Sequence, residues 1–118
     1  MSRDPWKLKV FVKADDLVVD VYAATRRFPP EERYGLQAQI RRVSVTANLV
    51  EGCARRTLRD YLHFVGTALS SASEVRYLLG LSGRLALLED RAATDLGNRY
   101  GELIRGLQTL ISSLENRV

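Results

Sequence analysis

Cysteine and histidine are nearly absent from this sequence, and their scarcity excludes several kinds of site. Cys53 is the only cysteine among 118 residues, so no disulfide can form within the chain, which fits a reducing compartment. His63 is the only histidine, so the paired Glu-x-x-His motifs of a di-iron bundle cannot be built. We therefore expect neither a metal site nor a bound cofactor.

Long hydrophobic runs are also missing. No apolar run approaches the roughly 18 residues that a membrane span needs, and the opening MSRDPWKLK lacks the apolar segment of a secretory signal. We expect a cytoplasmic protein that does not contact a membrane.

The overall composition is that of a globular protein. Apolar residues make up 46% and charged residues 27%, and the length predicts a single domain over residues 1–118.

The alternating pattern of β-strands is absent as well, whereas a helical period recurs four times. It predicts helices over 9–27, 32–54, 57–80 and 89–116. Pro29 and Pro30 end the first helix, and Thr57 with Asp60 resembles a capping box at the start of the third. We expect an all-α protein, an up-down-up-down antiparallel four-helix bundle. The second helix should bury one line of apolar side chains: Leu36, Ile40, Val43, Ala47, Val50 and Ala54.

The last predicted helix carries a second apolar line beside the first. Ile104, Ile111 and Val118 recur every seven residues, and one bundle core does not require both lines. We interpret the second line as an oligomer interface, which would make the protein its own partner. The alternative is one broad stripe that faces the core of its own bundle.

Catalytic patterns are hard to find. Cys53 and His63 could act as nucleophile and base, but no orienting third group or oxyanion site follows at a recognisable spacing. A small buried cysteine and a partly packed histidine explain the same residues more simply. Glycine-rich phosphate loops and serine-nucleophile motifs are absent. We expect no enzyme.

Polar groups are set into the second predicted helix. Asn48, Glu51 and Gly52 interrupt its apolar run; Glu51 can pair with Arg55, and Gly52 leaves room for a close helix approach or a left-handed cap. Our interpretation is structural: Asn48 and Glu51 form hydrogen bonds within the bundle and fix how the second helix meets the third.

Positive charge is concentrated in one segment. Residues 26–60 contain eight Arg and four acidic residues, whereas the rest of the chain balances ten basic against ten acidic residues, so this segment carries the whole net charge of +4. The guanidinium group suits phosphate recognition. A solvated charged face, or codon usage that favours Arg, would give the same pattern. The candidate nucleic-acid-binding residues are Arg41, Arg42, Arg55, Arg56 and Arg59.

Five stretches of the sequence are familiar: WKLKVFVKADDLV, FPPEERYGL, QIRR, SVTANLVEG and DYLHFVGTALSSASEV. Together they resemble the four-helix-bundle family of intervening-sequence proteins, encoded in insertions within 23S ribosomal RNA genes. They also resemble the related accessory variability proteins of diversity-generating retroelements. One departure is Thr46, where the family usually has proline, and it bears on whether the second helix bends.

The resemblance implies a homopentameric ring without known enzymatic activity. For the retroelement branch it implies binding to a reverse transcriptase and, through a basic surface, to nucleic acid; for the ribosomal branch the role is open. We expect a non-catalytic oligomeric accessory protein that contacts RNA or DNA backbone. The alternative is a purely structural or protein-interaction module with no nucleic-acid role.

Overall fold

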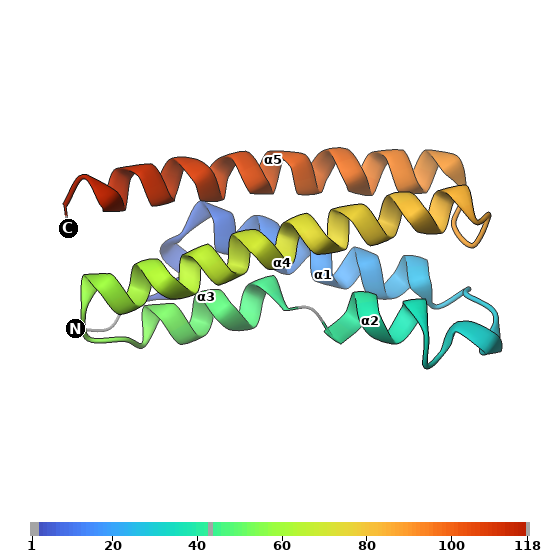
Figure 1. Ribbon diagram of the computed structural model, residues 1–118, viewed down its shortest axis with the longest axis horizontal. Helices are drawn as coiled ribbons and strands as arrows, with labels where there is room; N and C mark the ends of the chain where they lie inside the picture. The colour runs from blue at the N-terminus through green and yellow to red at the C-terminus, as the bar shows by residue number, and fades with distance from the viewer. Residues whose placement is uncertain (1–2, 43, 118) are drawn as a thin grey trace.

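A computed structural model describes residues 3–42 and 44–117 of the chain (Figure 1). These residues form helices and connections and no strand, which confirms the all-α prediction. The molecule is a rod of 45 × 22 × 19 Å. Its elements are the short 3-10 helices η1 (Pro5–Lys7) and η2 (Pro30–Glu32) and the α-helices α1 (Lys9–Thr25), α2 (Leu36–Arg42), α3 (Val45–Cys53), α4 (Leu58–Arg84) and α5 (Asp90–Glu115).

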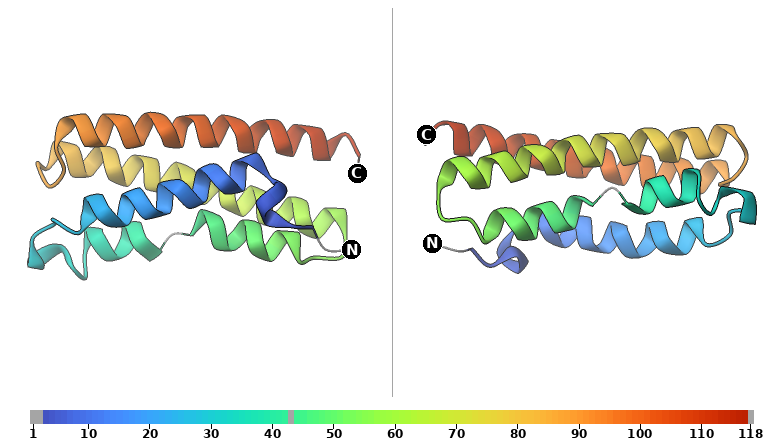
Figure 2. Two further views of the ribbon diagram at one scale, coloured as in Figure 1. Left: turned by 180° about the vertical axis from the view of Figure 1, so that it is seen from behind. Right: turned by 60° about the horizontal axis from the view of Figure 1, so that its bottom comes forward.

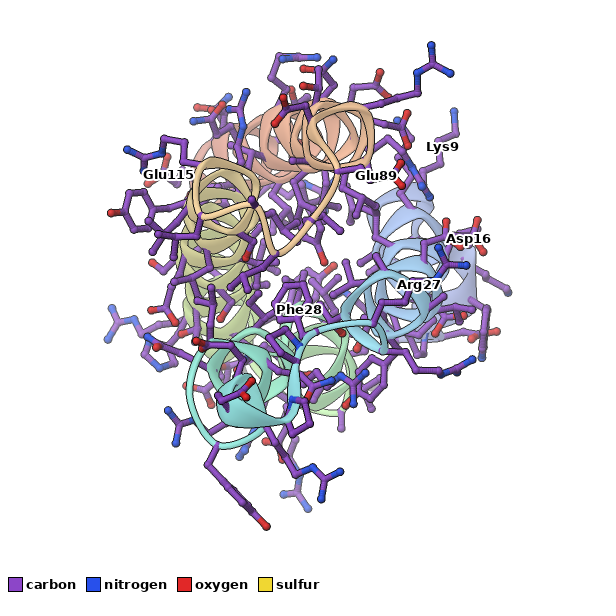
Figure 3. The ribbon with its side chains drawn as sticks, turned by 90° about the vertical axis from the view of Figure 1, so that its right-hand side faces the viewer. Lys9, Asp16, Arg27, Phe28, Glu89 and Glu115 are labelled. Atoms are coloured by element: carbon purple, nitrogen blue, oxygen red, sulfur yellow. The ribbon has the colours of Figure 1, made fainter. Side chains whose placement is uncertain are left out.

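The helices form a four-cornered antiparallel bundle in which α2 and α3 together occupy one corner (Figure 2). α4 packs on α5 along its length and on α2 and α3, and α1 completes the square against α5, α2 and α3. Within the described residues α1 does not pack against α4, so these two are diagonal partners, as the end view of Figure 3 shows. Short connections between sequence neighbours give this arrangement.

The core lies where the predicted apolar lines meet. Leu17, Leu49, Val65, Leu103 and Leu107 are at most 2% exposed. Phe28 closes one end of the core, where it points into the bundle (Figure 3). The buried positions of α1, α4 and α5 therefore recur every three or four residues, as the heptad spacing of the sequence predicts.

The prediction of a single helix over 32–54 is wrong, because the structure has two shorter helices there, α2 from residue 36 to 42 and α3 from residue 45 to 53. Ser44 is extended (φ −113°, ψ 105°), and its hydroxyl accepts the N–H of Ala47 at 3.0 Å, which starts a new helix in a new register. Val45, Leu49 and Cys53 are buried, whereas Val50 is 46% exposed. The predicted Ala47 and Ala54 also face solvent, and Val43 lies outside the described residues.

The break arises without proline at Thr46. A serine that can satisfy a helix N-terminus competes locally with helix continuation. Asn48 adds to the same turn, since its Nδ2 donates to the carbonyl oxygen of Ser44 at 2.7 Å. The second corner of the bundle is thus divided by side-chain capping.

α4 starts where the capping box predicts, and it ends later than predicted. Thr57 Oγ1 accepts the N–H of Asp60 at 3.0 Å. Gly80 and Gly83 do not stop the helix, which runs to Arg84. The stop is a Schellman motif: Leu87 N–H bonds to Ser82 O at 2.9 Å and Ala86 N–H to Gly83 O at 3.0 Å. Ala86 adopts the left-handed conformation (φ 59°) that this motif demands.

α5 buries one apolar line, made of Leu96, Tyr100, Leu103, Leu107 and Leu114, and the second line lies at the edge of the same core. Leu103 and Leu107 are 0% exposed, while Ile104 and Ile111 are half-buried and pack against the core cluster. Val118 lies outside the described residues. Both interpretations of the second line therefore fit one subunit. None of the described helices combines the length and the apolarity that crossing a membrane requires.

Candidate nucleic-acid interface

The connection from α3 to α4 presents a cluster of arginines, which we call the basic turn: Arg3, Arg55, Arg56 and Arg59. Arg56 and Arg59 are exposed and form no ion pair among the described residues. Arg55 Nη2 lies 2.8 Å from Glu51 Oε2, and its guanidinium carbon stands 4.6 Å from the centroid of the Phe64 ring. The basic turn therefore offers at least two uncompensated guanidinium groups.

Arg3 joins this cluster from the N-terminal segment of the chain. Its backbone N–H donates to Cys53 O at 2.7 Å, which ties the N-terminal segment to the end of α3. Its guanidinium carbon stands 4.0 Å from the centroid of the buried Tyr61 ring, a cation–π geometry. Sequence analysis missed Arg3, because it lies 50 positions from Cys53 along the chain and no local pattern links them.

Arg41 is held by the bundle. Its Nε donates to Thr25 Oγ1 and its Nη2 to Tyr22 O, both at 3.0 Å, and its guanidinium lies over the Tyr22 ring at 4.5 Å. Tyr22 O already accepts the N–H of Arg26 at 3.1 Å, so Arg41 adds a second donor at the C-terminal end of α1, where the negative end of the helix dipole favours a cation. Arg41 thus joins α2 to the end of α1. Arg42, the next residue, is exposed.

The five predicted arginines do not form one patch in a subunit. Arg41 and Arg42 end α2, whereas the other three follow α3, and at 1.5 Å of rise per residue the two groups stand roughly 20 Å apart along the bundle. Each group meets different neighbours. A continuous basic surface that includes all five arginines would require adjacent subunits of an oligomer.

The polar residues of α3 act locally. Asn48 bonds to Ser44 and Glu51 to Arg55, and within the described part of the chain neither side chain forms a hydrogen bond to α4. Gly52 is where α3 approaches α4 closely: a Cβ on it would lie 2.9 Å from Phe64 Cβ and 3.3 Å from Tyr61 Cδ1. Its φ is not positive, so it serves packing and is no left-handed cap.

Cys53 and His63 occupy different environments. Burial raises the pKa of the Cys53 thiol, with the charge of Arg3 lowering it and that of Asp4 raising it further. The thiol is therefore protonated near neutral pH, which is the opposite of an activated nucleophile. His63 is exposed, with its ring edge-to-face to Phe64 at 5.4 Å. In the described part of the chain no three His, Cys, Asp or Glu side chains gather as metal ligands.

A second group of arginines lines an open groove at the far end of the bundle, where α1 turns into η2 and α2. Arg26, Arg33 and Arg41 line it together with Tyr22 and Gln37, and its volume is about 550 Å³. We call this the arginine groove. The charge count of the sequence included Arg26 and Arg33, but only the fold brings them beside Arg41.

The family is decided by a comparison with family models. The one described as 23S rRNA-intervening sequence protein matches residues 6–109, most of the chain. The chain belongs to the 23S rRNA-intervening sequence protein family. The sequence resemblance to that family is confirmed.

A solved structure has the same fold as this intervening-sequence protein. It is a protein of unknown function from the S23 ribosomal protein family of Bacteroides thetaiotaomicron, with a TM-score of 0.80 and 22% sequence identity. The match covers 86% of this chain and 97% of that one. At this identity the likeness supports the bundle architecture alone. No curated protein sequence matches the chain.

Proposed function

We propose that this intervening-sequence protein is a non-catalytic, oligomeric protein that binds the sugar–phosphate backbone of RNA or DNA. The observation that carries the proposal is the pair of exposed arginines on the basic turn, Arg56 and Arg59, which have no carboxylate partner among the described residues. The family name connects related proteins with ribosomal RNA genes, which favours RNA as the ligand and the cytoplasm as the location.

The chemistry of the basic turn suits backbone rather than base recognition. Guanidinium groups on a short connection and on the first turn of the helix that follows it can reach phosphates as charge-assisted hydrogen-bond donors. Arg55 and Arg56 lie on the connection 54–57, and Arg59 is the second residue of α4, so at most one of the three is on a helix, where it cannot by itself read base edges in a groove. Binding should therefore depend weakly on sequence and strongly on salt, because each neutralised phosphate releases counterions.

Oligomerisation would multiply a modest charge. A net charge of +4 per chain produces a weak field, but repetition around a symmetry axis places several basic turns on one assembly. The half-buried Ile104 and Ile111 are the proposed contact residues, together with Val118, and the resemblance implies a ring of five. Arg42, exposed on α2, would extend the basic surface between subunits.

A salt titration of structured RNA with a charge-reversed variant tests the proposal. The triple substitution Arg55→Glu, Arg56→Glu and Arg59→Glu should weaken binding equally for unrelated RNA sequences. If all three side chains contact phosphates, the slope of log affinity against log salt should become shallower by about 2 to 3, at roughly 0.7 per phosphate for single-stranded parts of the RNA and 0.9 for duplex parts.

The matched control changes the same charge elsewhere. Arg84, Arg91 and Arg105 are exposed on α4 and α5, and reversing all three alters the net charge equally. The control should weaken binding far less. If the wild-type protein does not bind RNA at low salt, or if both triple variants bind alike, the basic turn is no nucleic-acid interface.

Failure of that experiment would leave the other proposal, a structural or protein-interaction module with solubilising arginines. A reverse transcriptase as partner stays a prediction from the resemblance to retroelement accessory proteins. A reverse-transcriptase gene and template repeat beside this gene would favour that partner, and a position within a ribosomal RNA operon would favour the ribosomal branch.

A further inference from the structure

All charged side chains that line the arginine groove are positive. Tyr22, Arg26, Arg33, Gln37 and Arg41 line it, and no acidic side chain of the described residues is part of its wall. Arg26 and Arg33 are exposed and form no ion pair in the described part of the chain. Three cations around one depression repel one another, so an anion placed between them would lower the energy of the groove.

Part of this site is built rigidly. Gln37 Nε2 donates to Thr25 O at 2.7 Å, and Arg41 is fixed by Thr25 Oγ1 and Tyr22 O. A guanidinium has five N–H groups, and Arg41 uses two, so three remain for a ligand. A pre-ordered donor loses little conformational entropy when a ligand binds.

We propose that the arginine groove binds a phosphate monoester, carried by a free nucleotide or by the end of a nucleic-acid strand. Three guanidinium groups around one groove match a doubly charged phosphate better than the single charge of an internal phosphodiester. A volume of about 550 Å³ leaves room for an attached sugar and base. This site goes beyond backbone binding by the basic turn, because it lies at the opposite end of the bundle and recognises a different charge state.

Titration of the full-length protein with AMP and with adenosine at low salt tests the site. AMP should bind and adenosine should not, because only AMP carries the phosphate. Arg26→Gln and Arg33→Gln should each weaken AMP binding by about tenfold or more. Arg42→Gln is the matched control: Arg42 is exposed on α2 but does not line the groove, so its loss should change little.

Acidification supplies a second readout. The second pKa of a phosphate monoester is about 6, so lowering the pH from 7.5 to 5 should weaken AMP binding about tenfold while the arginines stay charged. Glu31 and Glu32 are the carboxylates next to Arg33 in the sequence, and Glu32 Oε1 accepts the N–H of Leu36 at 3.2 Å. Their protonation would strengthen anion binding, so it cannot produce the expected loss.

Short RNA separates the two sources of phosphate. If the ligand is a strand end, a 5′-phosphorylated hexamer should bind more tightly than its 5′-hydroxyl form and than AMP; if it is a nucleotide, AMP should bind best. The triple variant of the basic turn should still bind AMP. Loss of RNA binding by the basic turn and loss of AMP binding by the arginine groove can therefore be told apart. Equal binding of adenosine, unchanged affinity in both Gln variants, or tighter binding of a phosphoserine peptide would overturn the proposal.

Discussion

Replacing Gly52 by alanine measures how closely α3 and α4 approach. A Cβ at this position would stand 2.9 Å from Phe64 Cβ and 3.3 Å from Tyr61 Cδ1. Unbonded carbon atoms prefer about 3.5 to 4.0 Å, so the helices must separate by several tenths of an ångström. Because Phe64 Cβ is fixed to the backbone, side-chain rotation cannot relieve the contact.

Two opposing terms set the magnitude. Alanine is about 0.8 to 1.0 kcal/mol more favourable than glycine within a helix, whereas overpacking costs about 1 to 3 kcal/mol. We expect Gly52→Ala to lose about 1 kcal/mol of unfolding free energy. Gly66→Ala in α4 is the matched control: no neighbouring heavy atom lies within 4 Å of its added Cβ, so it should gain nearly 1 kcal/mol.

Urea unfolding followed by far-UV circular dichroism compares the two variants at one protein concentration, since self-association would otherwise shift the apparent stability. The expected difference of about 2 kcal/mol corresponds to roughly 8 °C between their thermal midpoints. If Gly52→Ala gained as much stability as Gly66→Ala, the close packing of α3 on α4 would be refuted.

Three further predictions concern the cap of α4, a buried tyrosine and α5. Ala86→Gly should raise the unfolding free energy by about 1 kcal/mol, because glycine adopts the left-handed conformation without the Cβ penalty; an unchanged urea midpoint would argue against the Schellman motif. Burial raises the pKa of Tyr100 to about 12, so the folded state holds this proton more tightly than the unfolded one, and stability should fall by about 2 kcal/mol as the pH rises from 10 to 12. Tyr100→Phe should lack that loss in unfolding measured across this range, and an identical pH profile would contradict the assignment. Leu103→Asp should unfold the bundle, at a cost above about 3 kcal/mol, because it buries a carboxylate in the core. The double variant Ile104→Glu, Ile111→Glu should keep its helical circular dichroism, and its mass in light scattering should fall to that of a monomer. If the wild-type protein is already a monomer, the proposed ring is wrong.

The basic segment was visible in the sequence, but its division was not. Counting charges between residues 26 and 60 located the arginines that later proved exposed, such as Arg56 and Arg59. The count could not tell that Arg41 binds the end of α1, since that contact joins residues 16 to 19 positions apart. The sequence did not predict the role of Arg3 or the arginine groove for the same reason, since both depend on contacts between residues far apart in the chain.

By itself the sequence determined the features that depend on neighbouring residues. The apolar spacing of α1, α4 and α5 and the cap at Thr57 are local, so they predicted the bundle and the start of α4. Tertiary structure decided the register of α3: the Ser44 cap is a local interaction, but which face of α3 is buried depends on how Val45 and Leu49 pack against the other helices. The physical reason is that a helix break costs few local interactions, and its free energy is settled by which side chains the other helices can bury.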